Sequence, residues 1–170
     1  MSWGNPCSAA IEVAKRIAAN VARKGYEHVF MPNIVVDSGP LIALFDGSDR
    51  FHERAVAFVR DLRGHLVTNL PVMTEVVYML DFSHQAQRDF LYWAEQALTI
   101  DRETPDDLPR IRALLNKYRD LPADFADASL VALCERMRVM DVASVDSDFS
   151  IYRARERHYF RNLFFEAESR

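Results

Sequence analysis

The sequence predicts an α/β domain, a three-layer α/β/α sandwich around a mostly parallel sheet of four or five strands. Short apolar stretches alternate along the chain with longer stretches of helical periodicity, the order typical of parallel sheets covered by helices on both faces. The chain has 170 residues, of which 49% are hydrophobic, so one domain with a substantial core is expected. No internal repeat or linker interrupts the alternation after about residue 31.

Each predicted element has a local signal. Ile34, Val35 and Val36 are β-branched and show no polar alternation, which is typical of a strand buried on both faces. Pro71 suits the first turn of a helix. The predicted helices cover residues 39–45, 51–63, 71–81, 84–97, 105–118 and 123–138. The predicted strands cover residues 34–37, 65–69, 98–101 and about 140–145, and the tail near 161–167 is expected to add an edge strand.

Residues 1–31 are expected to form an N-terminal amphipathic helical extension, and residues 32–170 the domain itself. An apolar stripe runs along residues 8–24, and Gly25 is suited to end that helix. Charged residues at 12, 15 and 16 interrupt this stretch, so it lacks the continuous apolar core that a signal peptide needs. The extension contributes none of the candidate site residues, so we expect it to dock on the domain or on a second subunit.

Composition excludes several classes of protein. The net charge is −4, so no global basic field indicates a nucleic-acid binder. Two cysteines give no disulfide framework, and the five histidines have no close metal-ligand spacing that would favour zinc. No apolar stretch is long enough to span a membrane, so a cytoplasmic protein without a membrane partner is expected.

Acidic residues occur at the ends of predicted strands and on the apolar faces of predicted helices. Asp37 and Asp146 follow apolar strands, and the carboxyl ends of parallel strands share the edge of the sheet where ligands bind. Glu75 and Asp127 lie on apolar helix faces, and Asp124 shares the face of Asp127. Because like charges in a poorly solvated cleft need compensation, a hard cation such as Mg²⁺ is expected there. A site of this kind activates water and neutralises charge on a phosphodiester.

Each acid also has a simpler interpretation. Asp37 could cap the helix that follows it, and Asp146 could cap the turn after it. Glu75 could pair with an arginine. Asp124 and Asp127 could simply stabilise the start of a helix through its dipole, without a role in a metal site.

The acids and their surroundings resemble the PIN domain, and within it the VapC-like toxin ribonucleases. In IVVDSGPLIALF, Asp37 follows an apolar strand and has the hydroxyl residue Ser38 beside it. FHERAVAFV is similar to the family's next helix, and TEVVYML supplies its glutamate, Glu75. The resemblance spans roughly residues 33–165, and Gly39-Pro40 departs from the family's usual small residues.

The last two motifs supply the remaining acids. DFADASLVAL matches the third motif with Asp124 and Asp127. SVDSDF matches the fourth with Asp146 and Asp148, although a serine precedes Val145 where threonine is common.

The resemblance implies a metal-dependent ribonuclease that hydrolyses RNA phosphodiester bonds, the toxin of a toxin–antitoxin pair. The implied catalytic residues, which hold one or two Mg²⁺ or Mn²⁺ ions, are Asp37, Glu75, Asp127 and Asp146. Asp124 and Asp148 would complete the metal site, and Ser38 would orient a ligand.

The resemblance also implies a homodimer and a small antitoxin protein that inserts a basic side chain among the acids. A surface for the dimer is offered by the helices over 71–81 and 84–97, through Tyr78, Phe82, Phe90 and Trp93.

The segment 150–161 is a candidate RNA-binding surface. It carries Arg153, Arg155, Arg157 and Arg161 together with three aromatic residues. The interpretation that we favour is a solvated face whose aromatic rings pack inward. Two other functions stay open. The first is a metal-dependent phosphohydrolase that uses Asp37, although the usual Asp-x-Asp pattern of phosphatases would need an acid at Gly39. The second is a non-catalytic module that binds RNA or protein.

Overall fold

A computed structural model describes residues 31–121, 124–146, 149, 151–154 and 158–166. Five strands form one sheet in the order β3-β2-β1-β4-β5, and every neighbouring pair is parallel. The strands are β1 (Asn33–Val36), β2 (His65–Asn69), β3 (Leu98–Asp101), β4 (Asp141–Ala143) and β5 (Arg161–Asn162). The predicted parallel α/β fold is confirmed.

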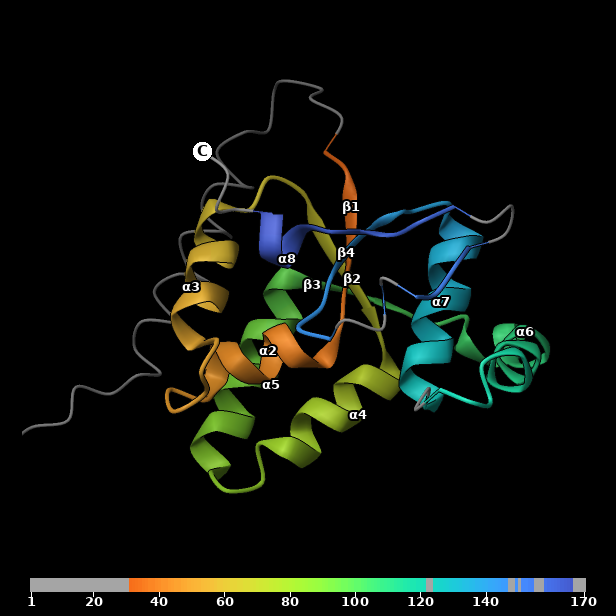
Figure 1. Cartoon of the computed structure of the whole chain (residues 1–170). Helices are drawn as coiled ribbons and strands as arrows, with labels where there is room; N and C mark the ends of the chain where they lie inside the picture. Colours follow the sequence, from red (N-terminus) through yellow and green to blue (C-terminus); the bar gives the residue numbers. More distant parts are fainter. Residues whose placement is uncertain (1–30, 122–123, 147–148, 150, 155–157, 167–170) are drawn as a thin grey trace, which may run out of the picture.

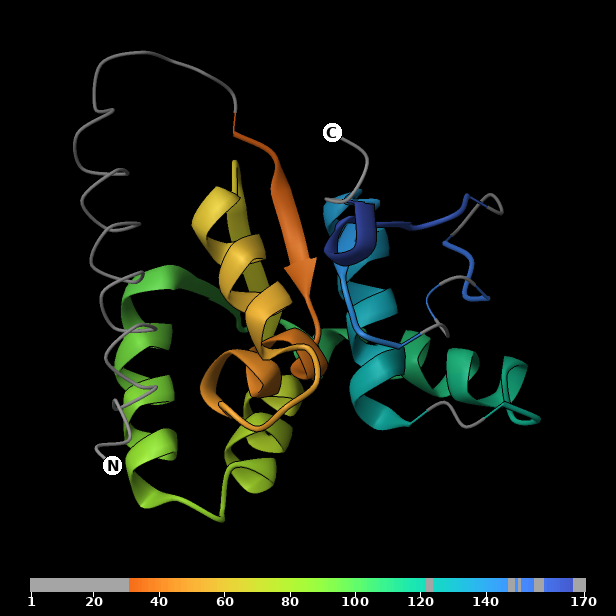
Figure 2. The same ribbon diagram turned by 60° about the vertical axis from the view of Figure 1, so that its left-hand side comes forward.

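Helices cover both faces of this sheet. They are α2 (Ser38–Phe45), α3 (His52–Asp61), α4 (Leu70–Met79), α5 (His84–Ala97), α6 (Thr104–Lys117), α7 (Phe125–Met137) and α8 (Leu163–Glu166). Figures 1 and 2 show α3 and α5 on one side of the sheet and α6 and α7 on the other, which gives three layers. The predicted extension lies, except for residue 31, outside the described residues.

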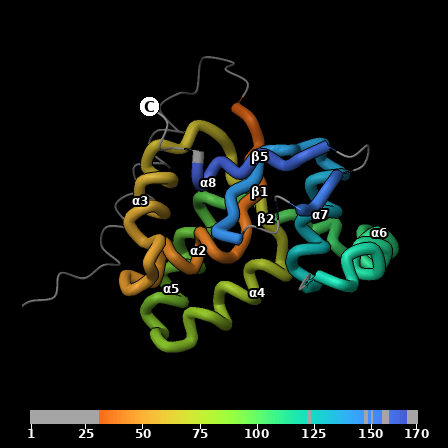
Figure 3. The backbone as a smooth tube through the Cα atoms, viewed as in Figure 1, coloured from red at the N-terminus to blue at the C-terminus, as the bar shows by residue number. Residues whose placement is uncertain are grey.

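The helix α4 has a different position, because it lies across the carboxyl end of the sheet. It follows β2 directly and packs against both α2 and α7. Figure 3 shows its path below the ends of the central strands. Residues carried by α4 therefore face the edge of the sheet at which β1 and β4 also end.

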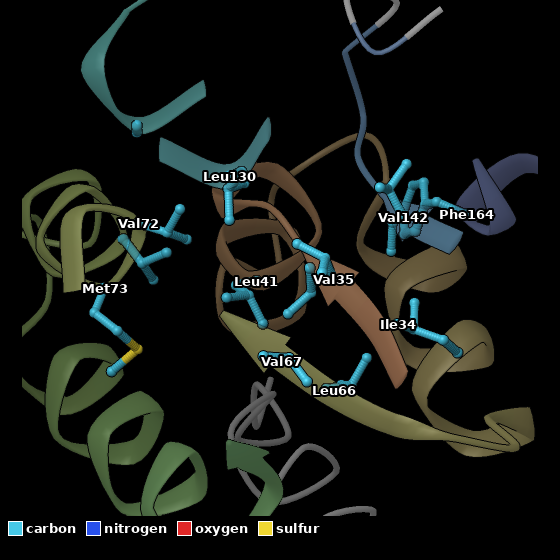
Figure 4. Packing of buried hydrophobic residues seen from close by; sticks show 14 of the residues in the cluster. Ile34, Val35, Leu41, Leu66, Val67, Val72, Met73, Leu130, Val142 and Phe164 are labelled. Carbon is cyan, nitrogen blue, oxygen red and sulfur yellow. The ribbon is translucent and has the colours of Figure 1, made fainter. Parts of the chain in front are cut away.

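The core is built on the two central strands. Figure 4 shows Val35 and Val67 packed among side chains from the covering helices, including Leu41 of α2, Val72 of α4 and Leu130 of α7. Each such buried side chain stabilises the fold by roughly 1.5–3 kcal/mol. The ends of α2, α4 and α7 are thereby held against the same strands.

Two predictions from the sequence are wrong in part. The tail does not continue as an edge strand to residue 167, since β5 is short and α8 follows it. The Asn162 Oδ1 atom accepts the N–H of Phe164 at 3.1 Å, which turns the chain into a helix. Phe164 is fully buried and packs on Phe58 of α3, with ring centroids 5.7 Å apart.

The predicted dimer surface also needs correction. Phe90 and Trp93 are buried, and their rings contact Phe45 at centroid distances of 5.6 and 5.7 Å. They occupy the face of α5 that meets α2, so they cannot serve a second subunit. Tyr78 and Phe82 are exposed. Within the part of the chain that the structure describes, no helix has the length and hydropathy needed to cross a bilayer.

Candidate functional site

Asp37 lies at the centre of the candidate site, directly after β1. Its carboxylate Oδ1 accepts the N–H of Ser38 at 2.7 Å, and its Oδ2 accepts the hydroxyl of Ser144 at 2.8 Å. Its own N–H donates to the carbonyl oxygen of Ala143 on β4 at 3.0 Å. Asp37 therefore caps α2, as its simpler interpretation expected, and is also held from a neighbouring strand.

Asp37 is only 7% exposed. Burial raises its pKa to about 6, and the charges of Glu75 and Asp124 add to this effect. The hydrogen bonds from Ser144 and Ser38 lower the pKa but do not offset burial. Asp37 consequently holds its proton more tightly than an exposed aspartate does.

Glu75 extends from α4 toward the same edge. Glu75 is half-buried. Along the same face of α4, Val72 is buried and Tyr78 is exposed, so only part of the predicted apolar stripe is covered by other elements. Burial raises the pKa of Glu75, the charge of Asp124 raises it further, and a hydrogen bond from the Ser38 side chain lowers it. Among the described residues Glu75 forms no ion pair with an arginine, which was its simpler interpretation.

The start of α7 supplies two more carboxylates. Asp124 caps the helix by accepting the N–H of Asp127 at 2.9 Å, and the Oδ2 atom of Asp127 accepts the N–H of Asp124 at 3.3 Å. The hydroxyl of Tyr152 donates to the same Oδ2 at 3.3 Å. Burial, followed by the charges of Asp37 and Asp124, raises the pKa of Asp127 to about 7. Asp124 and Asp127 therefore cap the start of α7 and also repel each other electrostatically.

Asp146 lies at the margin of this group. It is exposed and comes three residues after β4 ends, not directly at the strand end as the sequence predicted. Its N–H donates to the Ser144 hydroxyl at 3.0 Å, and that hydroxyl donates in turn to Asp37. Asp148 lies outside the described residues.

Sequence reasoning assigned no role to two polar residues that align these elements, although Ser144 opens the SVDSDF motif. Ser144 is completely buried and joins Asp37 to the turn that carries Asp146. Asn69 is buried at the end of β2, where it accepts the N–H of Val72 at 3.3 Å and donates to the Ser129 hydroxyl of α7 at 2.9 Å. An asparagine before a helix start is a recognisable cap signal, but its contact with α7 has no local signature.

The donor set suits a hard divalent cation. In this structure no three histidine, cysteine or acidic side chains of the described residues are arranged to hold a metal ion as they stand. However, burial is the largest cause of the raised pKa of Asp37, Glu75 and Asp127, and the charge of Asp124 raises the pKa of all three further. Such a group gains most from a cation with oxygen ligands, so the residues fit Mg²⁺ or Mn²⁺.

The described arginines of the segment 150–161 have partners within the chain. The guanidinium of Arg153 donates to the carbonyl oxygens of Ile151 and Tyr152 at 2.7 and 2.8 Å and lies over the ring of Tyr159. Arg161 forms a bidentate pair with Asp141 at 2.8 and 2.7 Å.

Two of the three aromatic residues of this segment, Tyr152 and Phe160, are buried, as the interpretation of inward packing requires. Arg155 and Arg157 lie outside the described residues.

Comparison with known proteins identifies the family. The PIN domain model matches residues 34–154, more than half of the chain. Among solved structures, the toxin VapC20 of Mycobacterium tuberculosis, described as cleaving the sarcin-ricin loop, is similar with a TM-score of 0.62 and 20% sequence identity. The match covers 69% of this chain and 93% of VapC20. No curated protein sequence matches the chain. The chain belongs to the PIN domain family.

Proposed function

We propose that this protein is a metal-dependent endoribonuclease that hydrolyses RNA phosphodiester bonds. The observation that carries the proposal is the group of carboxylates from β1, α4 and α7, whose pKa values are raised by burial and by one another. Ionising all of them at once is costly without a compensating cation. The membership of the PIN domain family and the similarity to VapC20 support the same reaction.

The proposed ligands are Asp37, Glu75, Asp127 and Asp146, with Asp124 and Asp148 completing the set. A bound Mg²⁺ or Mn²⁺ would supply a Lewis acid that activates water and neutralises charge on the phosphodiester.

The chain's own contribution is to hold these carboxylates before the metal arrives. Two donors orient Asp37, and the capping box together with Tyr152 orients Asp127. Oriented ligands of this kind reduce the cost of reorganisation when the site is occupied.

Labelled single-stranded RNA tests the reaction. We expect cleavage in Mg²⁺ or Mn²⁺ and none in EDTA. The variants Asp37→Asn and Asp127→Asn should fold, lose cleavage and bind Mn²⁺ more weakly by calorimetry, whereas the matched surface variant Asp81→Asn should retain both properties. Full activity of a folded Asp37→Asn or Asp127→Asn variant would contradict the assignment of the site.

The same assay separates the alternatives. A binding module would retain RNA without cleaving it. A phosphohydrolase would release phosphate from small esters, but an Asp-x-Asp pattern is sterically disfavoured, because a Cβ atom at position 39 would clash with the side chain of Val145.

We further propose that the protein is the toxin of a toxin–antitoxin pair, acts in the cytoplasm where its RNA substrate lies, and forms a homodimer. The carboxylate group offers an antitoxin a natural target, since one basic side chain would neutralise part of its charge. Exposed Met79, at the end of α4, and exposed Phe82, in the turn before α5, are candidates for the dimer surface. Light scattering at micromolar concentration tests the dimer, and a monomer would contradict it.

A further inference from the structure

We propose that Tyr78 is a stacking platform for one unpaired base of the RNA substrate, immediately beside the carboxylates. The inference rests on the proposed ribonuclease function and specifies how the substrate is held. It is carried by a surface depression of about 700 Å³ between α4 and α7. The residues that line this depression are Leu70, Pro71, Thr74, Glu75, Tyr78, Asp124, Phe125 and Ala126.

The depression joins the candidate site to an apolar surface. Glu75 and Tyr78 are three residues apart on α4, so their side chains share one face of the helix. Across the depression, Phe125 follows Asp124 at the start of α7. Each wall therefore presents one carboxylate and one aromatic ring.

Both of these rings are exposed. Tyr78 is 72% exposed and Phe125 is 45% exposed, and Leu70 beside them is 60% exposed. Isolated apolar residues on a surface are ordinary, but three that line one depression with two acids indicate a binding surface. The Thr74 hydroxyl is already engaged with the carbonyl oxygen of Leu70 at 2.9 Å. The Thr74 hydroxyl is thus not a free donor, and the exposed rings of Tyr78 and Phe125 remain for contact with a ligand.

The charge of the depression selects which part of a nucleotide enters it. Its two charged side chains, Glu75 and Asp124, are acidic, and no lysine or arginine among the described residues lines it, so a phosphate there would be repelled. A base is flat, uncharged and able to stack on an aromatic ring, and such stacking is tolerant of sequence. An unpaired base fits the walls, whereas a base within a duplex has both faces already stacked.

The test measures affinity for a labelled single-stranded RNA of twelve nucleotides by fluorescence anisotropy in Mg²⁺. All proteins are full chains that carry Asp37→Asn, so that hydrolysis does not consume the probe. Tyr78→Leu keeps an apolar side chain but removes the ring, and it should raise the Kd between about fivefold and about 150-fold. Tyr78→Phe should restore the affinity to within about twofold. Tyr92→Leu is the matched control, because Tyr92 is an exposed aromatic residue of α5 outside the depression.

The outcomes distinguish the inference from the proposed function. An unchanged Kd for Tyr78→Leu, in a chain that binds RNA and whose unsubstituted form cleaves it, would overturn the stacking platform and leave the nuclease intact. Absence of RNA binding by every protein, together with absence of cleavage by the unsubstituted chain, would overturn both; absence of binding with cleavage retained would overturn the stacking platform alone. A change from dimer to monomer on Tyr78→Leu would show that the depression is an interface between copies of the chain, which also overturns the inference. Equal loss of affinity for duplex and single-stranded RNA would contradict recognition of an unpaired base.

Discussion

Replacing Asp37 by asparagine is expected to stabilise the metal-free protein at neutral and alkaline pH. The native fold buries this carboxyl group and keeps it close to Glu75 and Asp124, so its pKa is raised from 3.8 to about 6. Asparagine has nearly the same shape, can still accept the N–H of Ser38, and can donate to the Ser144 hydroxyl. The substitution removes the charge, keeps the hydrogen bond from Ser38 and reverses the direction of the hydrogen bond with Ser144.

The size of the effect follows from the pKa. One pKa unit between the folded and the unfolded chain corresponds to about 1.4 kcal/mol. A pKa raised from 3.8 to about 6 therefore destabilises the fully ionised native protein by about 3 kcal/mol. This is an upper bound, since the neighbouring carboxylates titrate together with Asp37.

The sign of the pH dependence follows from the same shift. Because the folded chain binds the proton more tightly, the contribution of Asp37 to stability is fully present below about pH 4 and is lost as the pH rises through about 6. Asp37→Asn should match the unsubstituted chain near pH 4 and exceed it by up to about 3 kcal/mol at pH 8.

Urea unfolding in EDTA at several pH values measures this difference. Asp81→Asn serves as a control, because Asp81 is exposed and lies outside the carboxylate group, and it should follow the unsubstituted chain at every pH. If Asp37→Asn shows the same loss of stability between pH 4 and pH 8 as the unsubstituted chain, the reasoning about its burial and charge is wrong.

Three other predictions address the surroundings of the site. Ser144→Ala should raise the pKa of Asp37 above about 6 and reduce the free energy of unfolding at pH 8 by about 1.5–3 kcal/mol, as followed by urea denaturation; an unchanged value would refute the role of the hydroxyl. Tyr152→Phe should raise the pKa of Asp127 above about 7, as followed by NMR of the carboxyl carbon in the metal-free chain; no change would mean that the 3.3 Å contact is not a hydrogen bond in solution. A chain that starts at Met31 should fold, bind Mn²⁺ and cleave RNA like the full chain; loss of metal binding by the folded shorter chain would contradict the division at residue 31.

The sequence by itself determined the order of the elements and supplied most of the residues of the candidate site. The β-branched stretch at 34–36 and the helical periodicities that follow are local patterns, and they predicted a parallel sheet because alternating strands and helices have few ways to pack. Asp37 could be found because the carboxyl ends of parallel strands share one edge. Glu75 and Asp127 could be found because a carboxylate beside apolar helix positions is costly to bury without compensation.

Only the tertiary structure decided which helix faces meet other elements. Periodicity placed Tyr78, Phe90 and Trp93 on apolar faces, but packing against α2 buries Phe90 and Trp93 and leaves Tyr78 exposed. The hydrogen bonds that align the carboxylates also join residues far apart in sequence, such as Ser144 with Asp37 and Asn69 with Ser129. A local pattern carries no information about such pairs, because their geometry exists only after the strands and helices have packed together.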